Sequence, residues 1–90
     1  MARRAPLSPQ QAEAIAAEAL AFLAEDADRL GRFLALSGLA PTDIRAQLND
    51  AVFLGGVLDF VLGDDRLIVA LAERLGLPPE TPAAARRLLP

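Results

Sequence analysis

The sequence lacks cysteine, histidine, tyrosine, tryptophan and lysine, and these absences limit the chemistry available to the chain. Without cysteine there is no disulfide and no thiolate nucleophile. Without histidine the chain lacks the commonest general base and the commonest transition-metal ligand. The side chains left for catalysis are Asp, Glu and Arg, since the hydroxyls all lie at expected helix ends: Ser8, Ser37, Thr42 and Thr81. We therefore expect a protein that is not an enzyme and has no catalytic residue, cofactor or metal.

The chain also lacks an excess of positive charge and any long apolar segment. Its net charge is −3 and its pI is near 4.7, which gives no electrostatic attraction to nucleic acid. Polar residues follow Arg3 and Arg4 from Ser8 onward, so we expect no ordinary signal peptide. The longest apolar run is about 12 residues, against roughly 20 needed to span a bilayer. We expect a cytoplasmic protein without membrane insertion.

The distribution of apolar residues predicts an all-α fold. They recur at three- and four-residue spacing, the period of an amphipathic helix. Ninety residues provide one small core, so we expect one helical domain at residues 8–90, a compact bundle of five or six short helices. Residues 1–7 lack this period and are predicted to be a flexible N-terminal arm. Apolar residues form 53% of the chain, so either the packing is unusually efficient or a partner covers apolar surface.

Capping signals define the first two helices. Ser8, followed by Pro9 and Gln11, predicts a capping box and a helix that runs to about Ala24. Asp26 then caps a second helix, on whose outer face Asp28 and Arg32 are placed to form an ion pair. This helix is predicted to end at Gly38, where Leu39 can fold back in a Schellman motif.

The same signals divide the second half of the chain. A short third helix opens at Pro41 and is predicted to point Ile44 and Leu48 inward. Asp50 and Asp64 are expected to cap the fourth and fifth helices. Gly63 and Gly76 are expected to end the fourth and fifth helices. The sixth helix is expected to begin near Pro82.

The most apolar stretch, residues 51–62, is predicted to be the central helix of the bundle. A helix with so narrow a polar face is normally surrounded by other elements. It contains Gly55 and Gly56, each of which costs roughly 1 kcal/mol in helix propensity. A close approach of another backbone would explain these glycines, and a local kink is the alternative.

Asp59 is the one charged residue of this stretch. A carboxylate on a mostly buried helix must be paired, neutral or exposed to solvent. Its spacing from Ala51 and Gly55 favours an exposed stripe, and an ion pair with Arg66 or Arg74 or a place in a functional pocket are the alternatives.

Two segments 38 residues apart resemble each other. The identical pairs are Leu20/Leu58, Phe22/Phe60, Asp26/Asp64, Gly38/Gly76, Leu39/Leu77 and Pro41/Pro79. They are consistent with two three-helix halves related by internal duplication. Shared capping rules in a leucine-rich sequence would produce similar matches, so both explanations stay open.

The sequence disfavours two kinds of site. Glu25, Asp26, Asp28 and the pair Asp64–Asp65 could hold a hard cation, but they lack the spacing of an EF-hand loop and fit helix caps. The corner between the fifth and sixth helices resembles a helix-turn-helix, yet its last helix offers little beyond Arg86 and Arg87 for base contacts. Nucleic acid is therefore a disfavoured partner.

Three segments carry a resemblance to a known family: Leu20–Asp26, Arg29–Pro41 and Phe53–Leu62. The sequence resembles, over about residues 8–80, a family of small, mainly alphaproteobacterial proteins of unknown function, domain-of-unknown-function family thirty-five seventy-two. The resemblance implies a short, cytoplasmic, all-helical protein and supplies no activity. One position departs from the pattern, because Ala40 stands where related chains tend to have an Asp cap, so we expect a weakly held third helix.

These observations favour a non-catalytic protein–protein interaction module. The partner is unknown, and a second copy of the chain, giving a homodimer, is one candidate. A DNA-binding or regulator-associated domain using the corner between helices five and six is the first alternative. The second is a carrier of small apolar ligands, which would need an internal cavity beside Gly55 and Gly56.

Overall fold

The structure is a computed structural model, and it describes residues 6–90. Within these residues the chain is all α-helical, as predicted, and contains no strand. The elements are α1 (Pro9–Ala24), α2 (Ala27–Ser37), the 3₁₀ turn η1 (Pro41–Asp43), α3 (Ile44–Gln47), α4 (Ala51–Leu62), α5 (Asp65–Leu75) and α6 (Thr81–Arg86). Of the arm predicted at residues 1–7, residues 1–5 lie outside the described part. Leu7 is half-buried and packs against the core.

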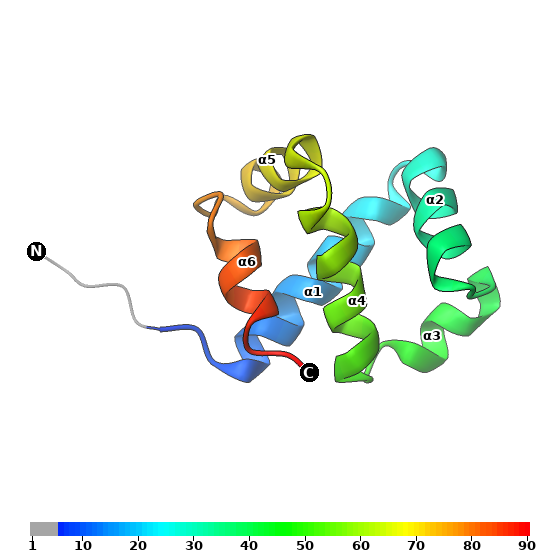
Figure 1. Cartoon of the computed structure of the whole chain (residues 1–90), viewed down its shortest axis with the longest axis horizontal. Coiled ribbons are helices and arrows are strands. Elements are labelled where there is room, and N and C mark those ends of the chain that lie inside the picture. The colour runs from blue at the N-terminus through cyan, green and yellow to red at the C-terminus, as the bar shows by residue number, and fades with distance from the viewer. Residues whose placement is uncertain (1–5) are drawn as a thin grey trace, which may run out of the picture.

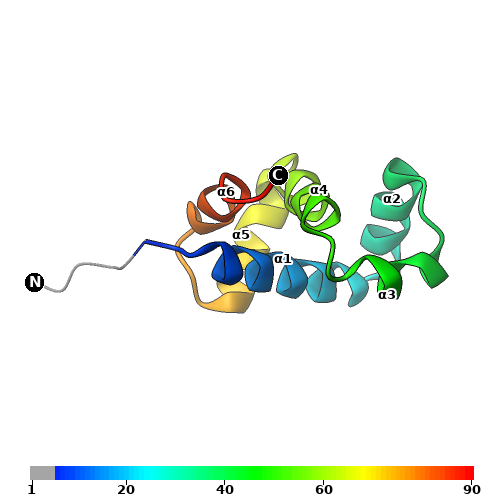
Figure 2. The same ribbon diagram turned by 90° about the horizontal axis from the view of Figure 1, so that it is seen from below.

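The two central helices, α1 and α4, cross at the middle of the molecule (Figure 1). α5 and α6 cover one end of this crossing, and α2 and α3 lie at the other end. Figure 2 shows α1 running below α4 and α6 in that view. The core side chains with no measurable exposure come from α1, α4, α5 and α6: Ala12, Ala16, Ala19, Leu23, Val57, Leu58, Val61, Leu71 and Ala85. Apolar residues of α1 at three- and four-residue spacing, Ala12, Ala16, Ala19 and Leu23, therefore face the core.

The predicted N-terminal caps are present. At the start of α1 the amide of Gln11 donates to Ser8 Oγ at 3.1 Å, and the amide of Ser8 donates to Gln11 Oε1 at 2.8 Å. The carboxylates of Asp26, Asp50 and Asp64 each accept from main-chain amides in the first turn of α2, α4 and α5. Local capping chemistry therefore sets where these four helices begin.

The two left-handed glycines end their helices differently. Gly38 (φ 74°) donates to Leu34 O, while the amide of Leu39 donates to Ser37 Oγ, so α2 ends in a simple αL motif. The Schellman motif predicted here was wrong. That motif occurs at the end of α5, where the amide of Leu77 donates to the carbonyl of Ala72 at 2.9 Å.

The third helix is short, as predicted, but more exposed than the sequence indicated. It consists of η1 followed by the single turn of α3, and Leu48 is 40% exposed instead of pointing inward. Ile44 is half-buried and packs on the core as expected. No side chain caps the first amides of this turn at Ala40, and Asp43 Oδ2 accepts from the amide of Ala40 itself at 3.0 Å.

α4 contacts its neighbours on one side and is open on the other. Leu54, Val57, Leu58 and Val61 are buried, whereas Val52 is 65% exposed. The prediction of a fully surrounded helix was therefore wrong. So was the stripe predicted through Gly55, because Gly55 is buried and Gly56 is the exposed glycine. The internal duplication stays a prediction.

Candidate functional site

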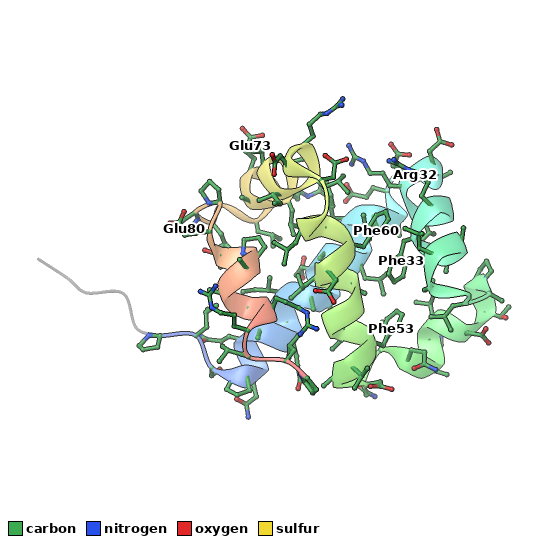
Figure 3. The ribbon with its side chains drawn as sticks, in the orientation of Figure 1. Arg32, Phe33, Phe53, Phe60, Glu73 and Glu80 are labelled. Carbon is green, nitrogen blue, oxygen red and sulfur yellow. The ribbon has the colours of Figure 1, made fainter. Side chains whose placement is uncertain are left out.

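The open side of α4 faces α2 across an apolar groove. The rings of Phe33, Phe53 and Phe60 point toward one another in the space between the two helices (Figure 3). The centroid of Phe33 lies 5.9 Å from that of Phe53 and 5.6 Å from that of Phe60, with interplanar angles of 68° and 71°. Such edge-to-face contacts are the favoured aromatic arrangement. These three rings form a floor that joins α2 to the bundle.

A cavity of about 480 Å³ lies over this floor and opens to solvent. We call it the α2–α4 groove, and its lining residues are Phe33, Leu36, Ser37, Leu39, Phe53, Gly56, Asp59 and Phe60. The sequence builds it by giving α2 one buried residue, Phe33, and placing Leu36 three residues later in the same helix. Leu36 is 79% exposed, the highest value among the large apolar side chains of residues 6–90.

The two adjacent glycines of α4 have different surroundings. A Cβ at Gly55 would lie 2.9 Å from the main-chain oxygen of Pro90 and 3.2 Å from the Arg86 guanidinium. The predicted close approach is therefore present at Gly55, although the C-terminal segment makes it. A Cβ at Gly56 would meet no atom within 4 Å. Gly56 lines the groove, and no packing within residues 6–90 requires it to be glycine.

Asp59, at the edge of the groove, is both exposed and paired. Its side chain is 59% exposed, and Oδ1 accepts from Arg86 Nε at 2.7 Å. Arg86 Nη1 also donates to Leu89 O at 2.9 Å and Pro90 O at 3.3 Å. The hydrogen bond with Asp59 raises the pKa of the Arg86 guanidinium, so this cation remains charged.

The expected partners of Asp59 were wrong. Arg74 instead pairs with Glu25 and joins the end of α1 to α5. No ion pair of Arg66 is found within residues 6–90. Asp59 and Arg86 are 27 positions apart, and the turn before α6 brings them together. The spacing of residues within a single helix therefore does not indicate this pair.

A second cavity, of about 320 Å³, continues the groove toward α5. The two cavities share Leu36, Asp59 and Phe60, and the second adds Arg32 (labelled in Figure 3) and Asp64. The expected Asp28–Arg32 pair is not formed. Within residues 6–90 the pair on α2 is Arg29 with Asp26, at 3.8 Å. Arg32 therefore lines the groove extension without an ion-pair partner in this part of the chain.

Three of the acidic residues considered as cation ligands have structural roles. Asp26 and Asp64 cap helices, and Glu25 binds Arg74. Within residues 6–90 no three acidic side chains lie close enough together to hold a metal ion. None of the helices described there is long and apolar enough to cross a bilayer.

The parts of the structure that the two alternative functions would use do not have the features that those functions need. α6 has six residues, and Thr81, Pro82 and Ala85 are buried, so the helix packs into the bundle and does not stand out as a recognition helix. Beside Gly55 the space is filled by Pro90 and Arg86, and the cavity at Gly56 opens to solvent.

Sequence reasoning missed the groove itself. Phe33 comes from α2 and Phe53 and Phe60 come from α4, so their meeting depends on the tertiary fold and not on local spacing. The available signal was Leu36, an apolar residue outside the inward stripe of its helix.

Comparison with known proteins supports the family suggested by the sequence. The model of the family described as Protein of unknown function (DUF3572) matches residues 9–90. No curated protein and no solved structure gives a match. Because the match spans nearly the whole chain, this protein belongs to the family of proteins of unknown function DUF3572.

Proposed function

We propose that this protein is a non-catalytic, cytoplasmic protein–protein interaction module whose docking surface is the α2–α4 groove. The observation that carries the proposal is an open apolar groove over one aromatic floor. Leu36 is 79% exposed and lines this groove together with Phe33, Phe53 and Phe60. Contiguous exposed apolar surface of this kind is typical of binding sites.

The shape of the groove suits a helix. It lies between two antiparallel helices, it is lined mainly by apolar side chains, and its wall at Gly56 has no side chain to obstruct a backbone. Helix-in-groove recognition uses apolar anchors at three- and four-residue spacing against such a surface. Burying one anchor such as leucine contributes roughly 1.5–3 kcal/mol.

The test compares three tagged proteins in a quantitative pull-down from the native cell: the wild type, Leu36→Asp and Val69→Asp. Val69 is 49% exposed on α5 and does not line the groove, so its variant is a matched control for adding a charge to an exposed apolar position. We expect Leu36→Asp to lose proteins that the wild type and Val69→Asp both capture. Identical sets from all three would contradict the proposed docking surface.

A further inference from the structure

We propose that the partner in the α2–α4 groove is a second copy of this chain, related by a two-fold axis. The inference rests on the proposed function and names its partner. A two-fold interface is made of the same patch on both subunits, so the patch must contain both a protruding group and a place to receive it. Here Leu36 protrudes at the rim, and the hollow over Phe33, Phe53 and Phe60 lies beside it. Leu36 of each copy would fill the hollow of the other.

Gly56 provides an independent observation. A glycine inside a helix costs roughly 1 kcal/mol relative to alanine, and Gly55 repays that cost by admitting Pro90 and Arg86. At Gly56 an added Cβ would meet no atom of residues 6–90 within 4 Å. It lies on the open side of α4, one turn from Val52 and next to the aromatic floor. If α4 crossed its symmetry mate at this point, the two backbones would approach through the space that a side chain at Gly56 would otherwise fill.

The charges at the edge of the groove are also self-complementary. Asp59 and Arg32 line the same extension of the groove, one from α4 and one from α2. Within residues 6–90 Arg32 has no ion-pair partner, and Asp59 uses Oδ1 for Arg86, with no hydrogen bond to Oδ2. A two-fold axis would bring Arg32 of each copy to Asp59 of the other. The same contact would then form twice.

The size of the face sets the expected affinity. α4 has 12 residues and is therefore about 18 Å long, and two neighbouring helices are roughly 20 Å wide. A face of these dimensions is smaller than the roughly 800 Å² that each partner buries in a standard interface. We therefore expect a reversible dimer that dissociates in the micromolar range.

The first experiment is sedimentation analysis of the full chain over a range of micromolar concentrations. The wild type and Val69→Asp should show the same monomer–dimer equilibrium. Leu36→Asp should weaken association at least tenfold. Gly56→Leu, which adds a side chain to a space that is empty in the monomer, should do the same while circular dichroism shows an intact helical fold. A wild type that stays monomeric, or association unchanged in both variants, would overturn the proposal.

A charge exchange tests the two-fold arrangement itself. Arg32→Asp and Asp59→Arg, each alone, would place like charges opposite each other and weaken self-association. Mixing the two folded variants should restore dimers, because each mixed dimer would contain two complementary pairs. Failure of the mixture to associate more strongly than either variant would overturn the Arg32–Asp59 contact and the axis it defines.

The experiments distinguish the interaction module from self-association, because either proposal can be contradicted alone. If the wild type is monomeric but Leu36→Asp loses a captured protein that Val69→Asp retains, the second copy is excluded and the interaction module stands. If the chain dimerises through the groove yet captures nothing else, the module serves self-association.

Discussion

The guanidinium of Arg86 joins the central helix to the end of the chain by binding Asp59. Arg86 Nε donates to Asp59 Oδ1 at 2.7 Å, and Arg86 Nη1 donates to the main-chain oxygens of Leu89 and Pro90. Leu89 is buried at 7% exposure, and Gly55 leaves the space that the segment occupies. One side chain thus holds Leu89 in the core and fixes the orientation of an acid at the groove.

Removing Arg86 should therefore cost more than removing the charge of Asp59. Asp59→Asn weakens one exposed ion pair, which is worth about 1 kcal/mol at most. Arg86→Ala removes all three hydrogen bonds and loosens the contact of Leu89, so we expect a loss of about 1–2 kcal/mol in the free energy of unfolding. Urea unfolding of both variants measures the difference. Equal losses would show that the contacts to the C-terminal segment contribute little.

The neighbouring glycines of α4 should respond in opposite directions to alanine. Both substitutions gain about 1 kcal/mol of helix propensity. At Gly56 the new methyl group meets no atom, so we expect the monomer to become more stable by about that amount. At Gly55 the methyl would lie 2.9 Å from Pro90 O, so displacement of the C-terminal segment should cancel or reverse the gain. Thermal unfolding at concentrations below self-association measures both, and equal shifts would contradict the packing described at Gly55.

Phe33 should control the attachment of α2. It is the buried residue of that helix, at 4% exposure, and its ring contacts both Phe53 and Phe60. We expect Phe33→Ala to cost about 3–4 kcal/mol and Phe33→Leu considerably less, because leucine refills much of the volume. Hydrogen exchange should show the amides of α2 losing protection before those of α1. Uniform loss across both helices would mean that α2 does not open independently.

The boundaries of the helices could be predicted because they depend on neighbouring residues. Ser8 and Gln11, or Asp26 and the amides after it, are close in sequence, so their hydrogen bonds follow from local geometry. The exposure of Leu48 could not be predicted, because apolar periodicity does not show where a neighbouring helix ends. The pairing of Asp59 with Arg86 and the meeting of Phe33 with Phe60 depend on the path of the whole chain. For this reason the fold class was predictable and the groove was not.

The stability of the protein should be insensitive to alkaline pH. The side chains that commonly titrate between about pH 7 and pH 11 are those of His, Cys, Tyr and Lys, and this chain contains none of these residues. The raised pKa of Arg86 preserves this behaviour. Its contribution is fully present below the pKa of an unfolded arginine and is lost only as pH rises through the higher folded value. Both values lie above the range in question.

Arg86→Lys provides the matched test of this pH dependence. Lysine has an ordinary pKa of about 10.4, which the Asp59 carboxylate would raise in the folded state. The contribution of this lysine to the free energy of unfolding should then be present below about pH 10 and be lost as the pH rises through the folded pKa of the lysine. Urea unfolding at about pH 7 and pH 11 should give nearly equal free energies for the wild type and a lower value at alkaline pH for the variant. A wild type that loses more than about 1 kcal/mol over this range would show that another group titrates on folding.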